Sequence, residues 1–329
     1  MSLFSAVVDF LKPEPPPSPA VSRAMESVGE LISPILRSTP GFEKKLSHPL
    51  EYALGYCDGL VAALPGPIDI NRQAFSTDPL VHALFATAGD IEQMLGRSES
   101  VRDFLASPAG LEHEHFYALF AARRQEKKQL GIVQHGDVIQ NDVPQRVIYF
   151  SAQALIEPDG DLAVTRDKLR TKALESLLHT FNTHIEALRN EREGLRADAS
   201  IERAHLMVMK GASAGQNIAV HTRHLQELDT RLRESVASLM PDEMLNALGT
   251  FLHNPEQALH LKPCTVTIDR LGVVCDPVPD DANIHTLNFP ELTARDNRLH
   301  IALLARISRD EALEAVETVR DQQYRFMLI

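Results

Sequence analysis

The chain has 329 residues, of which 44% are hydrophobic and 24% are charged, and its formal net charge at pH 7 is −12. These proportions are those of a globular protein and exclude general disorder. Because no apolar run approaches the roughly 18 residues that a membrane-spanning helix needs, no such helix is predicted. The acidic balance disfavours broad binding to a nucleic-acid backbone.

Short motifs exclude several further classes of protein. The first twelve residues lack a basic leader and Asp9 interrupts their apolar run, which argues against a secretory signal. Cys57, Cys264 and Cys275 form no Cys-x-x-Cys pair, so neither a disulfide framework nor a thiolate zinc site is indicated. Phosphate-binding, dinucleotide-binding and zinc-protease motifs do not occur. We expect a cytoplasmic protein without a cofactor, and the composition favours a bacterial origin.

Residues 1–19 are predicted to form a short amphipathic helix followed by a stiff proline-rich linker over residues 13–19. A helix held away from the body by such a spacer suits docking into the groove of a partner or of a neighbouring subunit. The alternative is that it folds back onto its own domain. The residues expected to contact a partner are Leu3, Phe4, Val7, Phe10 and Leu11.

Residues 20–130 carry apolar side chains at three- and four-residue spacing between prolines and glycines, which predicts a helical bundle domain. Ser107 and Pro108 look like the N-cap and first residue of a helix that extends to Phe120.

Residues 131–329 bring strand signals, which predict a small antiparallel sheet from residues 132–164 and 264–306. Strands are expected over residues 146–156, 162–164 and 299–306, and Ser308 with Glu311 forms a capping box that opens a helix over residues 308–328. Residues 264–268 and 273–275 predict a hairpin around a tight turn. With a two-residue turn, its buried face would carry Cys264, Val266, Ile268, Val273 and Cys275.

Residues 166–240, between the two strand regions, are predicted to form a coiled-coil arm. Its apolar positions follow alternating four- and three-residue spacing, with Arg192 as a polar member. Asp198 and Ser200 are predicted to form a corner, after which the spacing resumes in a second, antiparallel helix. The seam of the first helix is Leu174, Leu178, Phe181, Ile185, Leu188 and Leu195. The seam of the second is Ala204, Val208, Gly211, Gly215, Ile218, Thr222 and Leu225, followed by Leu228, Leu232 and Leu239.

The start of the arm is basic, because Arg166, Lys168, Arg170 and Lys172 crowd a helix end where the macrodipole favours anions. These cations need an acidic neighbour. An external acidic or nucleic-acid partner is the alternative to carboxylates within the chain. The carboxylates available in the sequence are Asp159, Asp161 and Asp167.

The five residues Gly211-Ala-Ser-Ala-Gly215 match the nucleophile-elbow pattern and follow an apolar run over residues 206–209. A serine hydrolase would use Ser213 as its nucleophile. The preceding residues are charged heptads rather than alternating strands and helices, which fits that class poorly. The alternative is that the two glycines let helices approach closely or mark a kink.

Histidines at helical spacing raise the possibility of a metal site. Glu202 and His205 have the i, i+3 spacing of di-iron bundles, and His221 and His224 lie one turn apart. A di-iron site needs further inward glutamates that the sequence does not supply, so we expect no metal and keep these four residues as the alternative. A buried polar residue at the seam would instead fix its register.

The sequence therefore predicts a mainly helical α+β protein, with a helical bundle and a small antiparallel sheet interrupted by a long helical hairpin. We expect a non-enzymatic interaction or scaffold subunit that binds another protein or a second copy of itself through the arm and the N-terminal helix. A serine hydrolase and a nucleic-acid-contacting subunit are the alternatives.

Overall fold

The computed structural model describes residues 17–135, 138–211, 215–275, 284–293 and 299–327. The chain is mixed α+β and mainly helical, as the sequence predicts. It divides into two compact units: unit 1 is Met1–Gly55 with Leu174–Pro255, and unit 2 is Tyr56–Ala173 with Glu256–Ile329. This division does not follow the predicted boundary at residue 130, because each unit combines distant segments of the chain.

Unit 1 is built from helices in its described residues. The first described helix starts at a local cap, where the Ser18 side chain accepts a hydrogen bond from the amide of Val21. Lys45 joins two of the helices through Asp242, at 2.6 Å, and Asn246, at 2.9 Å. The helices are α2 (Pro19–Leu31), α3 (Pro34–Arg37), the first part of α4 (Phe42–Ala62), α10 (Leu162–Gly211) from Leu174 onward, α11 (Gly215–Ser238) and α12 (Pro241–Leu252).

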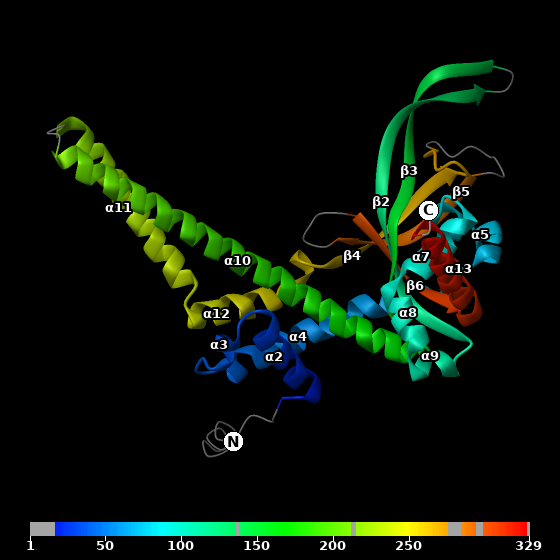
Figure 1. The fold of residues 1–329 in the computed structure, drawn as a ribbon, viewed down its shortest axis with the longest axis horizontal. Helices are drawn as coiled ribbons and strands as arrows, with labels where there is room; N and C mark the ends of the chain where they lie inside the picture. The colour runs from blue at the N-terminus through cyan, green and yellow to red at the C-terminus, as the bar shows by residue number, and fades with distance from the viewer. Residues whose placement is uncertain (1–16, 136–137, 212–214, 276–283, 294–298, 328–329) are drawn as a thin grey trace, which may run out of the picture. The chain divides into compact units, whose positions relative to one another are not determined.

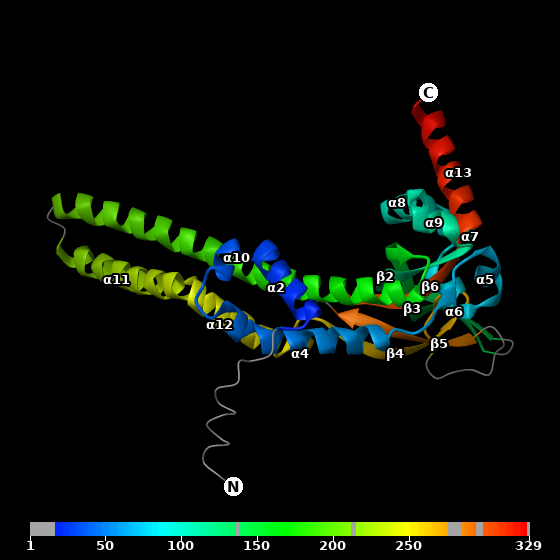
Figure 2. The same cartoon turned by 90° about the horizontal axis from the view of Figure 1, so that it is seen from below.

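Within unit 1, α10 and α11 lie side by side in opposite directions, and we name residues 188–238 the helical pair (Figures 1 and 2). Two contacts fix the antiparallel register. Glu191 of α10 accepts a hydrogen bond from Arg231 of α11 at 3.0 Å, and Leu195 packs in a buried cluster with Leu228. As residue numbers rise along α10, those of the α11 partners fall.

The predicted corner at Asp198 and Ser200 is wrong, because α10 is one helix of 50 residues that continues through both. The apolar spacing explains the continuity. The buried positions after Leu195 keep the four- and three-residue alternation without a break, so no corner is needed to restore the seam. These positions are Ala199, Glu202 and Leu206.

Unit 2 contains a six-stranded sheet with the order β3-β2-β6-β5-β4, in which these five strands are antiparallel to their neighbours. The two-residue strand β1 (Ile68–Asp69) pairs with β6 in parallel. β2 and β3 continue past their neighbours as a long two-stranded ribbon (Figure 1). The longer strands are β2 (His115–His135), β3 (Val138–Asp159), β4 (His260–Asp269), β5 (Ile284–Thr293) and β6 (Leu299–Ser308).

A short return segment after β4 bridges the two outer strands of this sheet. The amide of Val274 donates to the carbonyl of Arg146 in β3, and the amide of Ile148 donates to Gly272, both at 2.8 Å. The same segment pairs with β4, where Ile268 lies opposite Val274. The return segment therefore connects the two edge strands of the sheet, β3 and β4.

Short helices and the C-terminal helix cover one face of the sheet and complete the core of unit 2. Phe116, Phe120, Leu303 and Ile307 on the strands are buried in one cluster with Leu95 and other helical residues. The remaining elements of unit 2 include α5 (Arg72–Thr77), α6 (Pro79–Leu84), α7 (Ala88–Arg97), α8 (Glu99–Ala106), α9 (Pro108–Glu112) and α13 (Arg309–Met327), and η1 (Pro255–Gln257) begins at the last residue of unit 1.

Two predicted elements of unit 2 are wrong. The helix expected from Pro108 to Phe120 ends at Glu112, because the following apolar residues alternate with a period of two and are buried in β2. The strand expected over residues 162–164 is instead the first turn of α10, where the Asp161 carboxylate accepts the amide of Ala163 at 2.6 Å. Three other expectations are confirmed. The strand over residues 146–156 is part of the longer β3, and the strand over 299–306 is part of β6. The helix expected from residue 308 is α13, which begins one residue later.

The predicted hairpin after Cys264 forms, but its turn has a different length. Ile268 lies opposite Val274, which leaves three residues between the paired positions 269 and 273, with Gly272 at a φ of 80°. Val274 therefore shares the buried face with Ile268, and Val273 and Cys275 do not.

A strained position in β3 gives a test of this sheet. Ala152 has a φ of 52°, beside a register shift between β2 and β3. A non-glycine residue in this region costs about 1–2 kcal/mol, whereas glycine in a regular strand costs roughly 0.5–1 kcal/mol. We expect Ala152→Gly to maintain or raise the free energy of unfolding, and Ala154→Gly, its exposed neighbour on the same strand, to lower it. Urea unfolding of both variants checks this, and equal losses would contradict the strained bulge.

Candidate functional site on the outer face of the helical pair

The inner face of the helical pair contains one buried acidic residue. Glu202 is 7% exposed, and its carboxylate lies 2.7 Å from Nδ1 of His221 on α11. A buried carboxylate without a partner would be costly, so this contact fixes which turns of the two helices face each other. The inner seam thereby fixes the orientation of the outer face.

The opposite face of α10 carries a second apolar row, which we name the outer stripe. Each residue of an α-helix turns by about 100°, so residues spaced by four, three and four fall on one face. The outer stripe has this spacing and points away from the buried seam positions. Its members are Ala197, Ile201, Ala204 and Val208.

The outer stripe is exposed along its length. The side chains of Ile201 and Val208 are 56% and 73% exposed, and both alanines are also exposed. Met207 lies at one flank of the stripe and is 78% exposed. Large apolar side chains gathered on one exposed helix face are typical of a protein-interaction site.

The outer stripe corrects the predicted seam. Ala204 and Val208 are predicted as seam residues of a second helix that faces the first, but they belong to the unbroken α10 and are exposed. Sequence reasoning therefore missed Ala197 and Ile201 as surface residues of the same row. Continuing the spacing from Leu195, rather than restarting it after residue 200, would have identified the stripe.

Polar residues flank the outer stripe at matching positions. Asp198 and His205, seven residues apart, lie along one side, and Ser200 and Met207, also seven apart, lie along the other. All four are exposed. The face therefore combines an apolar centre with one acidic and one basic group on a single flank.

The four residues of the alternative metal site come together only in part. Glu202 contacts His221, and the ring of His205 lies 6.3 Å from that of His221 between centroids. His224 is exposed on α11. Among the described residues, no group of three side chains is arranged to hold a metal ion.

Ser213 lies outside the described residues, as do its two neighbours. Its context is nevertheless defined on both sides, since α10 ends at Gly211 and α11 begins at Gly215. A nucleophile elbow needs a strand before its serine. Here the preceding apolar run, residues 206–209, belongs to the helix α10, so the motif does not follow a strand as a nucleophile elbow does.

The basic start of α10 is paired within the chain. Lys168 lies 2.9 Å from Asp159 and Lys172 lies 3.7 Å from Glu157. Arg170 lies 3.3 Å from Asp58 and also contacts Asp167. Asp161 instead caps the helix.

Asp159 shows the strength of this pairing most clearly. Burial by itself would raise the pKa of its carboxyl, but the hydrogen bond from Lys168, the amide of Asp161 and the charges of Lys168 and His113 together lower it. The ionised form is therefore the stable one in the fold. Internal carboxylates satisfy three of the four cations, so an external acidic partner is not needed to explain them; no ion pair is found for Arg166 among the described residues.

The predicted contact residues of the N-terminal helix, from Leu3 to Leu11, lie outside the described residues. Their role as a docking element stays a sequence-based prediction.

The Asp159–Lys168 pair predicts a pH-dependent stability. The lowered pKa of Asp159 means that its contribution is full above the ordinary carboxyl pKa of about 3.9 and is lost as the pH falls below it. Asp159→Asn should therefore unfold more easily than the parent chain at pH 7, and the difference should shrink below about pH 4. Urea unfolding at several pH values measures this. Asp103→Asn, at an exposed helical position, is the control and should change stability little at any pH.

Comparison with known proteins gives no independent guide to these surfaces. Among the described residues, no helix is long and apolar enough to cross a membrane. No family model, curated protein or solved structure matches the chain.

Proposed function

We propose that this chain is a non-enzymatic interaction subunit that assembles through its helical pair. The observation that carries the proposal is the exposed outer stripe, where Ile201 and Val208 stand 56% and 73% exposed on the face of α10 opposite the seam. Burying such a side chain is worth roughly 1.5–3 kcal/mol. A helix that packs along this face would form a coiled-coil contact with α10.

The occupant that best complements the outer stripe is the outer stripe of a second copy. Small and large residues alternate along it, so an antiparallel pairing about a twofold axis between residues 202 and 203 would match them. Ile201 would face Ala204 of the partner subunit. Ala197 would face Val208 of the partner subunit, and each contact would occur twice.

The flanks of the stripe favour the same arrangement. In an antiparallel pair related by a twofold axis, each flank meets the same flank of the other copy. Asp198 would then lie beside His205 of the partner subunit, which is a favourable pairing when the imidazole is protonated. On the other side Met207 would cover Ser200 of the partner subunit, so neither flank brings like charges together.

The N-terminal helix remains a second docking element in this proposal. Its predicted apolar face and proline-rich linker suit binding in a groove of another subunit or of a different protein. Residues 1–19 share no residue with the outer stripe, so deleting them leaves the sequence of the stripe unchanged.

Two matched substitutions test the stripe. Val208→Asp and Val220→Asp both place a carboxylate at an exposed valine of the helical pair, 73% and 66% exposed respectively, but Val220 belongs to α11. We expect the parent chain and Val220→Asp to form dimers, and Val208→Asp to raise the dimer dissociation constant at least tenfold. Sedimentation equilibrium measures both. Monomeric parent protein, or equal weakening by the two variants, would overturn self-assembly through this face.

Deletion of residues 1–19 separates the two docking elements. If the outer stripe carries the assembly, the shortened chain stays dimeric, and Val208→Asp weakens it as in the full chain. A dimer that dissociates on deletion, yet tolerates Val208→Asp, would assign self-assembly to the N-terminal helix instead. Light scattering on the four proteins distinguishes these results.

A further inference from the structure

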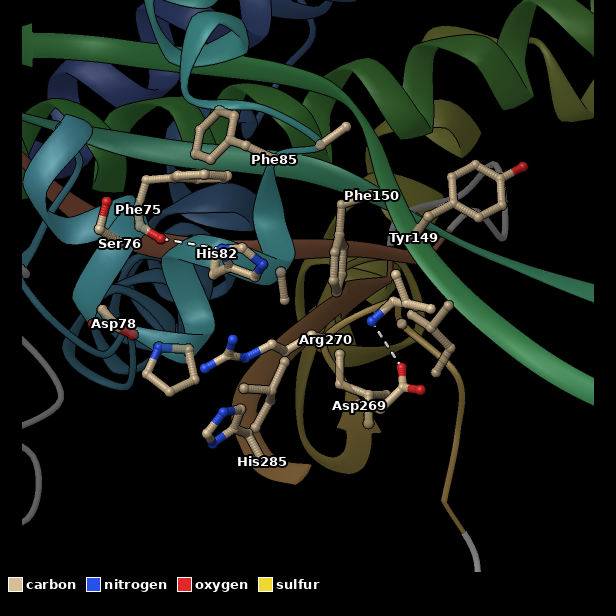
Figure 3. A pocket seen from close by; sticks show the side chains of 18 of the residues that line it. Phe75, Ser76, Asp78, His82, Phe85, Tyr149, Phe150, Asp269, Arg270 and His285 are labelled. Carbon is tan, nitrogen blue, oxygen red and sulfur yellow. Dashed lines mark hydrogen bonds between the residues drawn. The ribbon is translucent and has the colours of Figure 1, made fainter. Parts of the chain in front are cut away.

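Unit 2 contains a cavity of about 640 Å³ that the assembly through the helical pair does not use (Figure 3). Its walls come from α5 and α6, from β3, from the end of β4 with its turn, and from β5. This size is within the range of pockets that hold small molecules.

One part of the wall is apolar and belongs to the packed core. Phe85 directly follows α6 and is 4% exposed, Phe150 on β3 is 8% exposed, and both line the cavity (Figure 3). Ile268 and Leu287 continue the wall from β4 and β5. Because these side chains are fixed by the core, the apolar surface is formed before any ligand arrives.

Three nitrogen-bearing side chains from three different elements also line the cavity: His82 of α6, Arg270 of the turn and His285 of β5. Nδ1 of His82 lies 3.1 Å from the carbonyl oxygen of Phe75, so this nitrogen carries the hydrogen and donates it. Nε2 is left for another partner. Among the described residues, the side chains of Arg270 and His285 make no hydrogen bond or ion pair.

The backbone beneath Arg270 is held in place. The Asp269 carboxylate accepts hydrogen bonds from the amides of Leu271, at 2.8 Å, and Val273, at 2.9 Å. Gly272 has a φ of 80°, and a Cβ there would lie 2.4 Å from the carbonyl oxygen of Ile148. The two hydrogen bonds hold the turn, and the close approach to Ile148 excludes a larger residue at position 272, so the base of the Arg270 side chain is preorganised.

Two carboxylates occur among the described residues that line the cavity, and both make local contacts. Asp269 clamps the turn, and Asp78 caps α6 by accepting the amide of Leu80 at 2.8 Å. Their negative charges nevertheless oppose a ligand with two negative charges more than a ligand with one. The site thus favours a single negative charge opposite Arg270.

We propose that this cavity binds a small carboxylic acid with an apolar body. The guanidinium of Arg270 would hold the carboxylate, since its planar donors match the two oxygens, with His82 and His285 as neighbouring donors or acceptors. The apolar body would lie against Phe85, Phe150 and the aliphatic wall. A phosphate monoester, which is close to doubly charged at pH 7, fits less well.

Isothermal titration calorimetry on the full chain tests the proposal with three probes: octanoate, octanol and inorganic phosphate. Octanoate should bind at one site per chain and more tightly than either other probe, because it alone combines the charge with the apolar body. Arg270→Gln should weaken octanoate at least tenfold and leave octanol unchanged. Arg320→Gln, at an exposed arginine of α13, is the matched control and should bind octanoate like the parent chain.

Arg270 is exposed and has no described partner, so its substitution should leave the melting temperature unchanged, which circular dichroism verifies. Absence of octanoate binding, equal binding by the parent chain and Arg270→Gln, or tighter binding of phosphate than of octanoate would each overturn the proposal. These results are independent of whether the chain dimerises through the outer stripe.

Discussion

The register of α10 against α11 is the constraint on which the outer stripe depends. Leu195 is buried against α11 in one cluster with Leu228, and about two helical turns further along Glu202 contacts His221. Because the helix is continuous, these inward positions leave no freedom in which residues point outward. The position of the apolar outer stripe follows from this register, because one continuous helix places the seam residues on its inner face and the stripe residues on its outer face.

Much of the fold could be predicted from short-range patterns, and the failures have local causes. The strand around Tyr149 is rich in β-branched and aromatic residues, which favours a strand, and the strand around Leu303 is a short, nearly continuous apolar run. Phe116 and Phe120, by contrast, are four residues apart, a spacing that suits a helix face as well as one face of a strand. Only their pairing with β6, distant in sequence, decides between the two.

The candidate sites were harder to predict than the fold because they depend on relations between elements. The outer stripe was hidden by Asp198 and Ser200, whose turn-forming tendency is overridden by the packing of the seam on either side. The cavity residues His82 and Arg270 are separated by most of the chain, and no spacing rule connects them. The internal partner of Lys168 was accessible from sequence, since Asp159 precedes the helix by a few residues.

The return segment that includes Gly272 and Val274 has a consequence for the solubility of unit 2. Strands at the edge of an open sheet present unpaired amides and carbonyls, which recruit strands from other molecules and start aggregates. By pairing with both β3 and β4, this segment occupies backbone groups on the two outermost strands at once. A few residues after a tight turn thus protect the two edges of the sheet from unwanted polymerisation.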